Sequence, residues 1–259
     1  MDALIGVTGF VGGTLLRQRA FDRGFASADI ADIRGGDYGL VVCAGAPAAK
    51  WIADGNPDAD LANIQRLAGH LAEVLAAQFI LVSTVEVFAQ SAGVDEESAI
   101  DEANLTPYGR NRLWLERFVQ KTFPNALIVR LPALVGPGLR KNAVFDLLNG
   151  NNLHLIDARA TYQFYPMVNL WADISTALAA DLEVLHLTSA PLRIDEVAEQ
   201  GFGISFANRV EGRRPASYDF QTTHAAIFGS EGRYTYSRRE SLIAIRAYAQ
   251  SEPRSKPLA

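Results

Sequence analysis

The sequence contains a single cysteine, Cys43, so no disulfide framework can form within the chain. It lies in an apolar run at residues 40–46, where a free thiol packs as a small hydrophobic side chain. Long hydrophobic runs are also missing. None approaches the roughly 20 residues of a membrane-spanning helix, and no basic segment followed by an apolar one opens the chain. We therefore expect a soluble, cytoplasmic protein without a membrane partner.

The chain also lacks an excess of positive charge. It has 24 lysines and arginines against 29 aspartates and glutamates, which gives a formal net charge of −5. This balance argues against nonspecific binding to nucleic acid. The 4 histidines lack the spacing of metal ligands and have no cysteine cluster as partner, so no metal site is predicted. Hydrophobic residues make up 49% of the sequence, enough for a globular core.

Short apolar runs alternate with amphipathic segments up to Gly138. Strands are predicted at residues 3–7, 39–45, 79–83 and 126–132, and helices at 11–24, 58–78 and 106–122. Such alternation predicts a parallel sheet covered by helices on both faces. The segment between Gly24 and Leu40 is too short for two strands joined by a crossover helix, a unit that needs about 30 residues. We predict one strand and a turn there.

The pattern loosens after Gly138. Helices are predicted at residues 142–151, 169–181 and 237–250, extended segments at 153–156 and 162–168, and a strand at 184–189. The polar residues 251–259 are expected to be a disordered tail.

Gly6, Gly9 and Gly12 are regularly spaced between the first strand and the first helix. Glycines in that context let a turn close and let backbone N–H groups approach a phosphate at a helix N-terminus. A glycine pattern alone is a weak signal, but a preceding strand and a following helix are the context that supports nucleotide binding.

The stretch "TPYGRNRLWLE" predicts a helix start, with Thr106 as N-cap and Pro107 at the first helical position. Tyr108 and Arg112 are then one turn apart on one face. A guanidinium beside a phenol would lower the pKa of that phenol. The same spacing is common on ordinary helix surfaces, so this segment alone leaves both interpretations open.

Several motifs together resemble the extended short-chain dehydrogenases/reductases, the nucleotide-sugar epimerase/dehydratase family. "GVTGFVGG" is similar to the family's glycine loop, and "TPYGRNRLWLE" is similar to its Tyr-x-x-x-Lys helix. Further stretches follow the family's order: "LVVCAGAPA", "ANIQRL" with Asn63, "FILVSTVEVF", "LIVRLPALVGPG" and "QFYPMVNLWADI". The resemblance covers most of the chain.

The resemblance implies a doubly wound parallel-sheet α/β Rossmann fold, NAD or NADP as cofactor, and a nucleotide-linked sugar or similar substrate. Hydride would pass between the nicotinamide and a carbinol or ketone carbon. Tyr108 would be the acid/base, Thr84 would bond the reacting oxygen, and Arg112 would stand in the lysine position. Cofactor-binding positions are Gly6, Thr8, Gly9, Phe10, Val11, Gly12, Ala44, Gly45, Ser83, Tyr108, Arg112 and Pro132. Substrate-binding positions are Thr84, Glu86, Arg213 and Arg214.

Three positions depart from the family pattern. Arg112 stands where the family has a lysine that binds the nicotinamide ribose and lowers the tyrosine pKa. A guanidinium keeps the charge but is bulkier and planar. Ala133 stands where the family often has asparagine. Val85 stands where the 4,6-dehydratases have aspartic acid, so Glu86 is either a base without its acid partner or a plain strand-end carboxylate. The change at Arg112 supports a second hypothesis, a catalytically weak or silent dinucleotide-binding sensor or scaffold.

The choice of dinucleotide stays open at the sequence level. Asp29 and Asp32 could bind the free ribose of NAD, and Arg17 and Arg34 could meet the 2′-phosphate of NADP. Each of the four could also be a solvated surface charge.

The resemblance also suggests the domain organisation. We expect a dinucleotide-binding domain at residues 1–138 with a return at 168–187, and a small C-terminal substrate lobe at 139–167 and 188–250. Arg213 and Arg214 in that lobe suit a diphosphate, or belong to a solvated loop. A homodimer is expected through the helices at about residues 58–77 and 106–122.

Overall fold

The computed structural model describes residues 1–254, which form two compact units. The first unit contains residues 1–90, 96–131 and 170–186, and the second contains, among the described residues, 91–95, 132–169 and 187–254. Residues 91–95 and 132–138, expected in the dinucleotide-binding domain, thus group with the second unit. Within residues 1–254, no helix has the length and apolar character needed to cross a bilayer.

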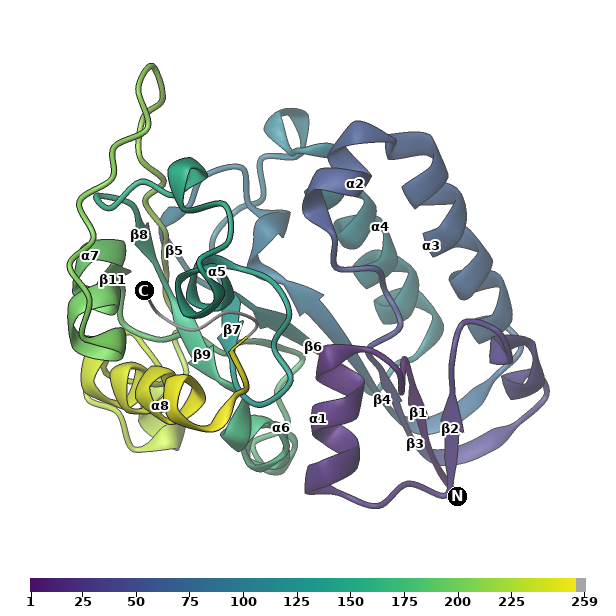
Figure 1. Ribbon diagram of the computed structural model, residues 1–259. Helices are drawn as coiled ribbons and strands as arrows, with labels where there is room; N and C mark the ends of the chain where they lie inside the picture. The colour runs from purple at the N-terminus through teal and green to yellow at the C-terminus, as the bar shows by residue number, and fades with distance from the viewer. Residues whose placement is uncertain (255–259) are drawn as a thin grey trace. The chain divides into compact units, whose positions relative to one another are not determined.

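The first unit is built on a six-stranded parallel sheet in the order β10-β6-β4-β3-β1-β2 (Figure 1). The strands are β1 Asp2–Ile5, β2 Arg23–Phe25, β3 Asp37–Cys43, β4 Leu75–Thr84, β6 Ala126–Leu131 and β10 Val184–His186. Every residue of β6 is buried, as expected for a strand covered on both faces. Cys43 at the end of β3 is also fully buried, which confirms its predicted place in the core.

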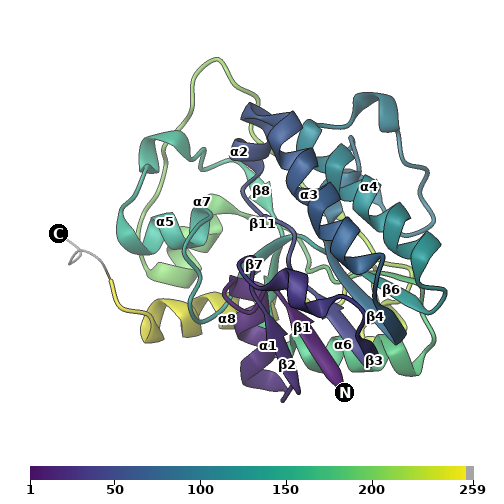
Figure 2. The same cartoon turned by 90° about the vertical axis from the view of Figure 1, so that its right-hand side faces the viewer.

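Helices cover both faces of this sheet (Figure 2). α1 Phe10–Gln18 and α6 Leu170–Ala179 lie on one face, and α3 Pro57–Leu71 and α4 Pro107–Thr122 lie on the other. Apolar side chains of α3 and α4, including Ile64, Leu71, Leu115 and Val119, form a core with the sheet. The predicted doubly wound α/β fold is confirmed.

Between Gly24 and Leu40 lie the end of β2, the 3₁₀ turn η1 Ile30–Ile33 and the start of β3, with no crossover helix, so the predicted single strand and turn are confirmed. The predicted helix at 11–24 was too long, because α1 ends at Gln18. Gly24 lies instead in β2, opposite Leu4 of β1. The pairing of β2 with β1 sets the C-terminal end of α1, and the local amphipathic pattern carries no information about that pairing.

The helix predicted at 58–78 was also too long. α3 stops at Leu71, and Leu75 begins β4 by pairing with Asp37 of β3. Ala76 and Ala77 favour helix by propensity, but the sheet pairing overrides that weak preference. A short helix before α3, α2 Lys50–Gly55, was not predicted.

The second unit contains three two-stranded pairs, β11-β8, β12-β5 and β7-β9. Their strands are β5 Ala92–Val94, β7 Ala133–Val135, β8 Thr161–Tyr162, β9 Phe164–Pro166, β11 Leu192–Arg193 and β12 Asp219–Phe220. The helices are α5 Ala143–Asn149, α7 Ile194–Glu196, which continues as a π-helical turn Val197–Phe202, and α8 Arg238–Ser251.

Local signals predicted some of these elements well. Asn142 caps α5 by accepting hydrogen bonds from the N–H groups of Val144 and Phe145, and Ser237 caps α8. The extended segment predicted at 153–156 was wrong, since Leu153–Leu155 is a 3₁₀ turn. Of the predicted tail, Ser251 closes α8, and residues 255–259 lie outside the described part of the chain.

Candidate functional site

The glycines after β1 and β3 and in the first turn of α1 lie where a side chain would collide with neighbouring atoms. Gly6 has a φ of 89°, and a β-carbon on it would lie 2.4 Å from the carbonyl oxygen of Ala44. A β-carbon on Gly12 would lie 2.1 Å from the carbonyl oxygen of Gly6, and one on Gly45 would lie 2.8 Å from a methyl carbon of Ile5. The two strand ends and α1 can approach this closely only because these residues are glycines.

α1 presents an open N-terminus at this turn. Gly9 is its N-cap and makes no side-chain hydrogen bond, and the first turn contains no acidic residue. Thr8 and Gly9 are exposed, and Phe10 and Val11 are half-buried. Backbone N–H groups and the helix dipole at such an end favour an anion. The turn is therefore a candidate binding position for a phosphate group.

The helix that carries Tyr108 begins where the sequence predicted. Thr106 accepts a hydrogen bond from the N–H of Gly109 at 3.2 Å, and Pro107 is the first helical residue. Asp54 of α2 supplies a second cap, because its carboxylate accepts the N–H of Tyr108 at 3.0 Å. The side chains of Asp54 and Thr106 thus hold the backbone N–H groups of Tyr108 and of the next residue, Gly109.

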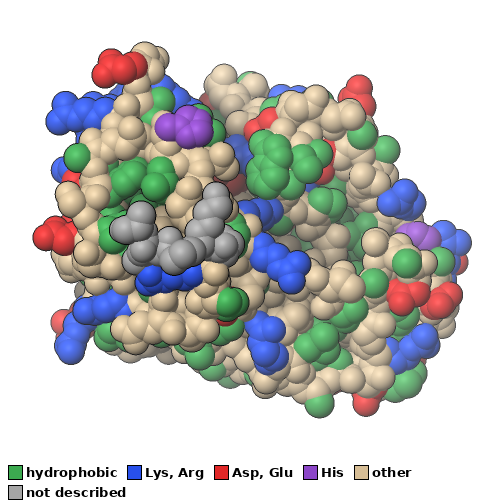
Figure 3. Space-filling view, viewed as in Figure 1, with side chains coloured by type: hydrophobic (Ala, Val, Ile, Leu, Met, Phe, Trp, Pro, Cys, Tyr) green, Lys and Arg blue, Asp and Glu red, His purple; other side chains and the backbone are tan. Residues whose placement is uncertain are grey.

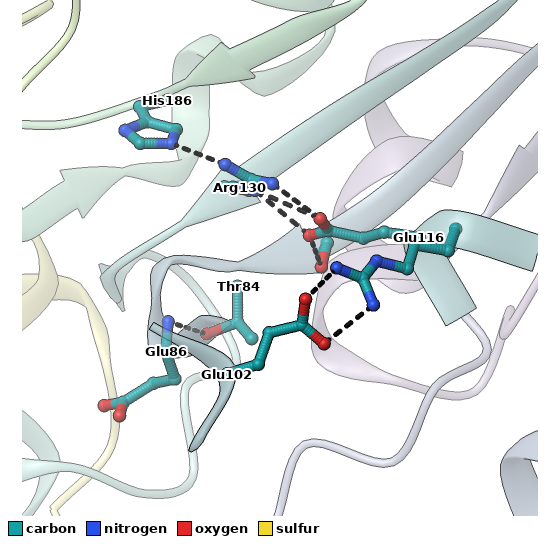
Figure 4. Close-up of polar contacts among 8 residues, drawn as sticks. Thr84, Glu86, Glu102, Glu116, Arg130 and His186 are labelled. Atoms are coloured by element: carbon teal, nitrogen blue, oxygen red, sulfur yellow. Dashed lines mark hydrogen bonds and ion pairs between the residues drawn. The ribbon is translucent and has the colours of Figure 1, made fainter. Parts of the chain in front are cut away.

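α4 packs directly against the end of β4. A β-carbon on Gly109 would lie 2.1 Å from the carbonyl oxygen of Glu86, so only glycine allows this contact. The Thr84 hydroxyl accepts the N–H of Glu86 at 3.2 Å (Figure 4). The same hydroxyl lies close enough to the Tyr108 phenol to act on the phenol pKa, which it lowers. The structure therefore brings together Thr84, Glu86 and Tyr108, all three of which the sequence singled out.

The predicted lowering of the Tyr108 pKa was wrong. Burial is the largest influence and raises the pKa of the phenol. The charge of Arg112 and hydrogen bonds from Thr84 and Arg112 act in the opposite direction, while the carboxylate of Glu86 raises the pKa further. The net direction is upward, because the sequence pattern shows the neighbouring cation but not the depth at which the phenol is buried.

Arg112 is buried and bonded to α3 and to the loop before α2 through both of its terminal nitrogens. Its guanidinium carbon lies 4.2 Å from the centroid of the Tyr108 ring. One terminal nitrogen donates to Asp60 at 2.6 Å, and the other donates to the second oxygen of Asp60 and to the carbonyl of Pro47. Asn111 donates to the same carboxylate at 2.8 Å. No hydrogen-bond partner for Nε lies among residues 1–254.

Sequence reasoning missed Asp60, although a signal was present. It occupies the apolar stripe of α3 that continues with Ile64, Leu67 and Leu71, where a carboxylate needs a partner. Burial opposes its ionisation, but hydrogen bonds from Arg112 and Asn111 outweigh that effect and lower its pKa. Asn63, on the neighbouring surface, is exposed and bonds only Arg66 among the contacts described.

A second ion pair lies at the end of β4. Lys50 of α2 donates to Glu86 at 2.6 Å, and both side chains are partly exposed. The next two residues, Trp51 and Ile52, are exposed hydrophobic side chains, and Figure 3 shows a hydrophobic cluster over α2. α2 therefore adds a cation and apolar surface beside the Thr84 strand end, neither of which the sequence interpretation used.

A buried polar network links β4, α4 and β6. Ser83 donates to Glu116 at 2.5 Å, and Glu116 also accepts Nη2 of Arg130 at 2.7 Å (Figure 4). Arg130 reaches the imidazole of His186 at 3.2 Å. Ser83, predicted at a cofactor-binding position, thus uses its hydroxyl to hold α4.

The remaining predicted residues lie elsewhere. Pro132 is half-buried just after β6, and Arg213 and Arg214 are exposed on the loop that follows Gly203 in the second unit. Asp29 closes a turn by accepting the N–H of Ala26.

Two of the four candidates for dinucleotide selectivity have partners on helices. Arg34 donates to His70 of α3 at 2.9 Å. Arg17 donates to Thr14 at 3.0 Å within α1.

Neither a family model nor a curated protein matches the sequence. Solved structures do share its fold. The dTDP-4-dehydrorhamnose reductase of Clostridium acetobutylicum ATCC 824 is 19% identical over 96% of this chain and 99% of that one, with a TM-score of 0.70. The dTDP-4-dehydrorhamnose reductase of Bacillus anthracis str. Ames, in complex with NADP, is 17% identical over 97% and 98%, with a TM-score of 0.73. A UDP-galactose 4-epimerase is 14% identical over 96% and 98%, with a TM-score of 0.70.

Proposed function

We propose that this protein is an NAD(P)-dependent oxidoreductase or epimerase that acts on a carbonyl or carbinol carbon of a nucleotide-linked sugar or a similar molecule. The observation that carries the proposal is the contact of Gly109 with the carbonyl of Glu86, which holds Tyr108 beside Thr84 at the carboxyl end of the parallel sheet. Ligands of open α/β sheets bind at that edge. The glycine turn after β1 ends at the same edge, since β1, β3 and β4 are parallel neighbours.

The cofactor would be NAD or NADP, with its pyrophosphate at the N-terminus of α1. Gly6, Gly9 and Gly12 would let the phosphates approach the backbone. The other proposed contacts are Thr8, Phe10, Val11, Ala44, Gly45, Ser83 and Pro132. When bound, this cofactor supplies or accepts the hydride, which no amino-acid side chain can do.

The residues of this chain would handle the proton and the orientation of the substrate. Tyr108 would give a proton to the reacting oxygen or take one from it, and Thr84 would hold that oxygen by a hydrogen bond. Glu86 would contact the substrate beside them, and Arg213 and Arg214 would bind a diphosphate. The absence of an acid at Val85 argues against a dehydratase.

The fold neighbours support the same class of substrate. Two are reductases of a dTDP-linked sugar, one of them in complex with NADP, and the third is named for a UDP-linked sugar. A shared fold by itself does not transfer an activity, so the proposal depends on the residues at the sheet edge.

A silent dinucleotide-binding protein is the second candidate. The observation in its favour is that both terminal nitrogens of Arg112, in the family's lysine position, already donate to Asp60 or Pro47.

One experiment separates the two candidates. Purified protein is screened for consumption of NADH or NADPH with dTDP- and UDP-linked keto sugars, and for the reverse reaction with the alcohols. Tyr108→Phe serves as the matched control. Turnover that the control lacks supports the enzyme. Tight dinucleotide binding without turnover of any of these substrates supports the silent protein.

A further inference from the structure

Three hydrogen bonds from two adjacent α4 residues converge on one carboxylate of α3. Asp60 receives Nη1 and Nη2 of Arg112 at 2.6 and 3.1 Å, and Nδ2 of Asn111 at 2.8 Å. Arg112 and Asp60 are 3% and 7% exposed. A buried pair with this many bonds has one defined geometry, because each partner would otherwise leave an unpaired charge.

The position of the guanidinium distinguishes this pair from an ordinary link between helices. α4 carries a second buried pair, Glu116 with Arg130, which shows no contact with the phenol among the interactions described. The Arg112 guanidinium instead lies over the Tyr108 ring, 4.2 Å from its centroid, and its charge lowers the pKa of the phenol. Whatever fixes Arg112 therefore also fixes the ring and the charge beside its oxygen.

We propose that Asp60 and Arg112 act together as positioning residues for Tyr108. Asp60 holds the guanidinium against the phenol ring and offsets its charge, so that the phenol stays protonated and the site is built to reduce a carbonyl rather than to oxidise a carbinol. This inference rests on the proposed function, and it assigns Arg112 to Tyr108 instead of to the cofactor ribose.

The charges around the phenol agree with that direction. Arg112 is the cation of α4 beside it, and Asp60 of α3 neutralises Arg112. Glu86 lies beyond the end of β4 and pairs with Lys50 of α2, and Asp54 of α2 accepts the backbone N–H of Tyr108. Burial and Glu86 both raise the Tyr108 pKa, and together they outweigh the guanidinium. The protonated phenol is therefore the resting form at neutral pH.

The reductive step needs no reductant other than the reduced dinucleotide, which would supply the hydride, while Tyr108 supplies the proton. The carbonyl carbon of the substrate accepts the hydride, and its C=O π bond breaks toward oxygen. That oxygen takes the Tyr108 proton and becomes a hydroxyl, while Thr84 holds it in place. The hydride would come from the bound reduced dinucleotide, which would be left oxidised, and the Tyr108 phenolate would take a proton from water. The reverse reaction would start from the phenolate, which this environment disfavours.

The first test needs no substrate. Phenol ionisation is followed by ultraviolet difference spectroscopy, and the Tyr108→Phe titration is subtracted to isolate Tyr108. In the parent protein, Tyr108 should titrate above the ordinary value of about 10. In Asp60→Asn the guanidinium loses its counter-charge, so the midpoint should fall by about one unit or more. The control is Glu102→Gln. It breaks the exposed ion pair between Glu102, which precedes α4, and Arg117 of α4, and it should leave the Tyr108 midpoint unchanged.

A double variant guards against a simple folding defect in Asp60→Asn. Asp60→Asn with Arg112→Gln removes both charges, so its Tyr108 midpoint should return toward or above the parent value. Circular dichroism checks that each variant is folded. If Asp60→Asn leaves the midpoint at the parent value, or if the double variant falls as far as the single one, Asp60 does not act on Tyr108 and the proposal is overturned.

Activity separates this inference from the proposed function. Asp60→Asn should move the basic limb of the pH profile for carbonyl reduction to lower pH by the same amount as the spectroscopic midpoint. It should also raise the ratio of oxidative to reductive turnover. A shifted midpoint in a protein that turns over no substrate would refute the proposed function and leave the Asp60 effect standing. Turnover with an unshifted midpoint would refute the Asp60 effect alone.

Discussion

Gly109 of α4 lies against the carbonyl oxygen of Glu86, and a β-carbon on Gly109 would come within 2.1 Å of that oxygen. This contact fixes how closely Tyr108 approaches Thr84, because Tyr108 directly precedes Gly109 and Thr84 lies two residues before Glu86. A methyl group at Gly109 would have to push the helix start away from the strand end.

Gly109→Ala should therefore reduce kcat by about 10²-fold or more, because misplacing a reacting group by about 1 Å can have that effect. Gly69→Ala in α3 is the matched control, since nothing lies within 4 Å of the β-carbon it adds. The control should keep full activity and gain up to about 1 kcal/mol in urea unfolding. Equal activity of the two variants would contradict the role of the Gly109 contact.

Tyr108→Phe removes the transferable proton and keeps the ring that Arg112 contacts. Proton transfer by a positioned side chain typically contributes about 10²- to 10⁴-fold in rate. The variant should lose at least about 10²-fold in kcat and bind the dinucleotide with nearly the parent Kd, measured by fluorescence titration. An unchanged kcat would exclude Tyr108 as the acid/base.

The open N-terminus of α1 predicts where the pyrophosphate binds. Thr8→Glu places a carboxylate beside that end and should weaken dinucleotide binding by about 10-fold or more, because it repels the phosphates and competes for the helix dipole. Leu16→Glu is the control on the same helix, since Leu16 is 45% exposed and lies near the other end. Calorimetry that finds the same Kd for both variants would place the phosphates elsewhere.

The Glu116–Arg130 pair predicts a large effect on stability. Glu116→Gln leaves the buried guanidinium without its counter-charge and should lower the free energy of unfolding by about 3–5 kcal/mol. Arg117→Gln breaks only an exposed pair and should change it by less than about 1 kcal/mol. Urea denaturation followed by circular dichroism measures both. Similar losses for the two variants would mean that the buried pair contributes no more than the surface one.

A homodimer through α3 and α4 is also predicted, with the two helices pairing across a two-fold axis. Trp114 of α4 is 38% exposed and stacks on Phe118, so it would lie at such an interface. Trp114→Glu should convert the dimer to monomer at micromolar concentration in light scattering. A monomeric parent protein would refute the prediction directly.

The amino-acid sequence alone determined the features that depend on neighbouring residues. The alternation of apolar runs with amphipathic segments predicted a parallel sheet covered by helices on both faces. The shortness of the segment before Leu40 limited it to one strand and a turn. Thr106 and Pro107 marked the start of α4 because a cap and its helix are adjacent in the chain.

Only the tertiary structure decided the features that depend on distant residues. The ends of α1 and α3 are set by strand pairing, which overrides local propensity. Asp60 meets Arg112, and Gly109 meets Glu86, because α3, α4 and β4 converge at one edge of the sheet. The direction of the Tyr108 pKa follows from the same convergence. The pattern Tyr-x-x-x-Arg places a cation near the phenol, but burial, which no spacing encodes, exerts the larger effect.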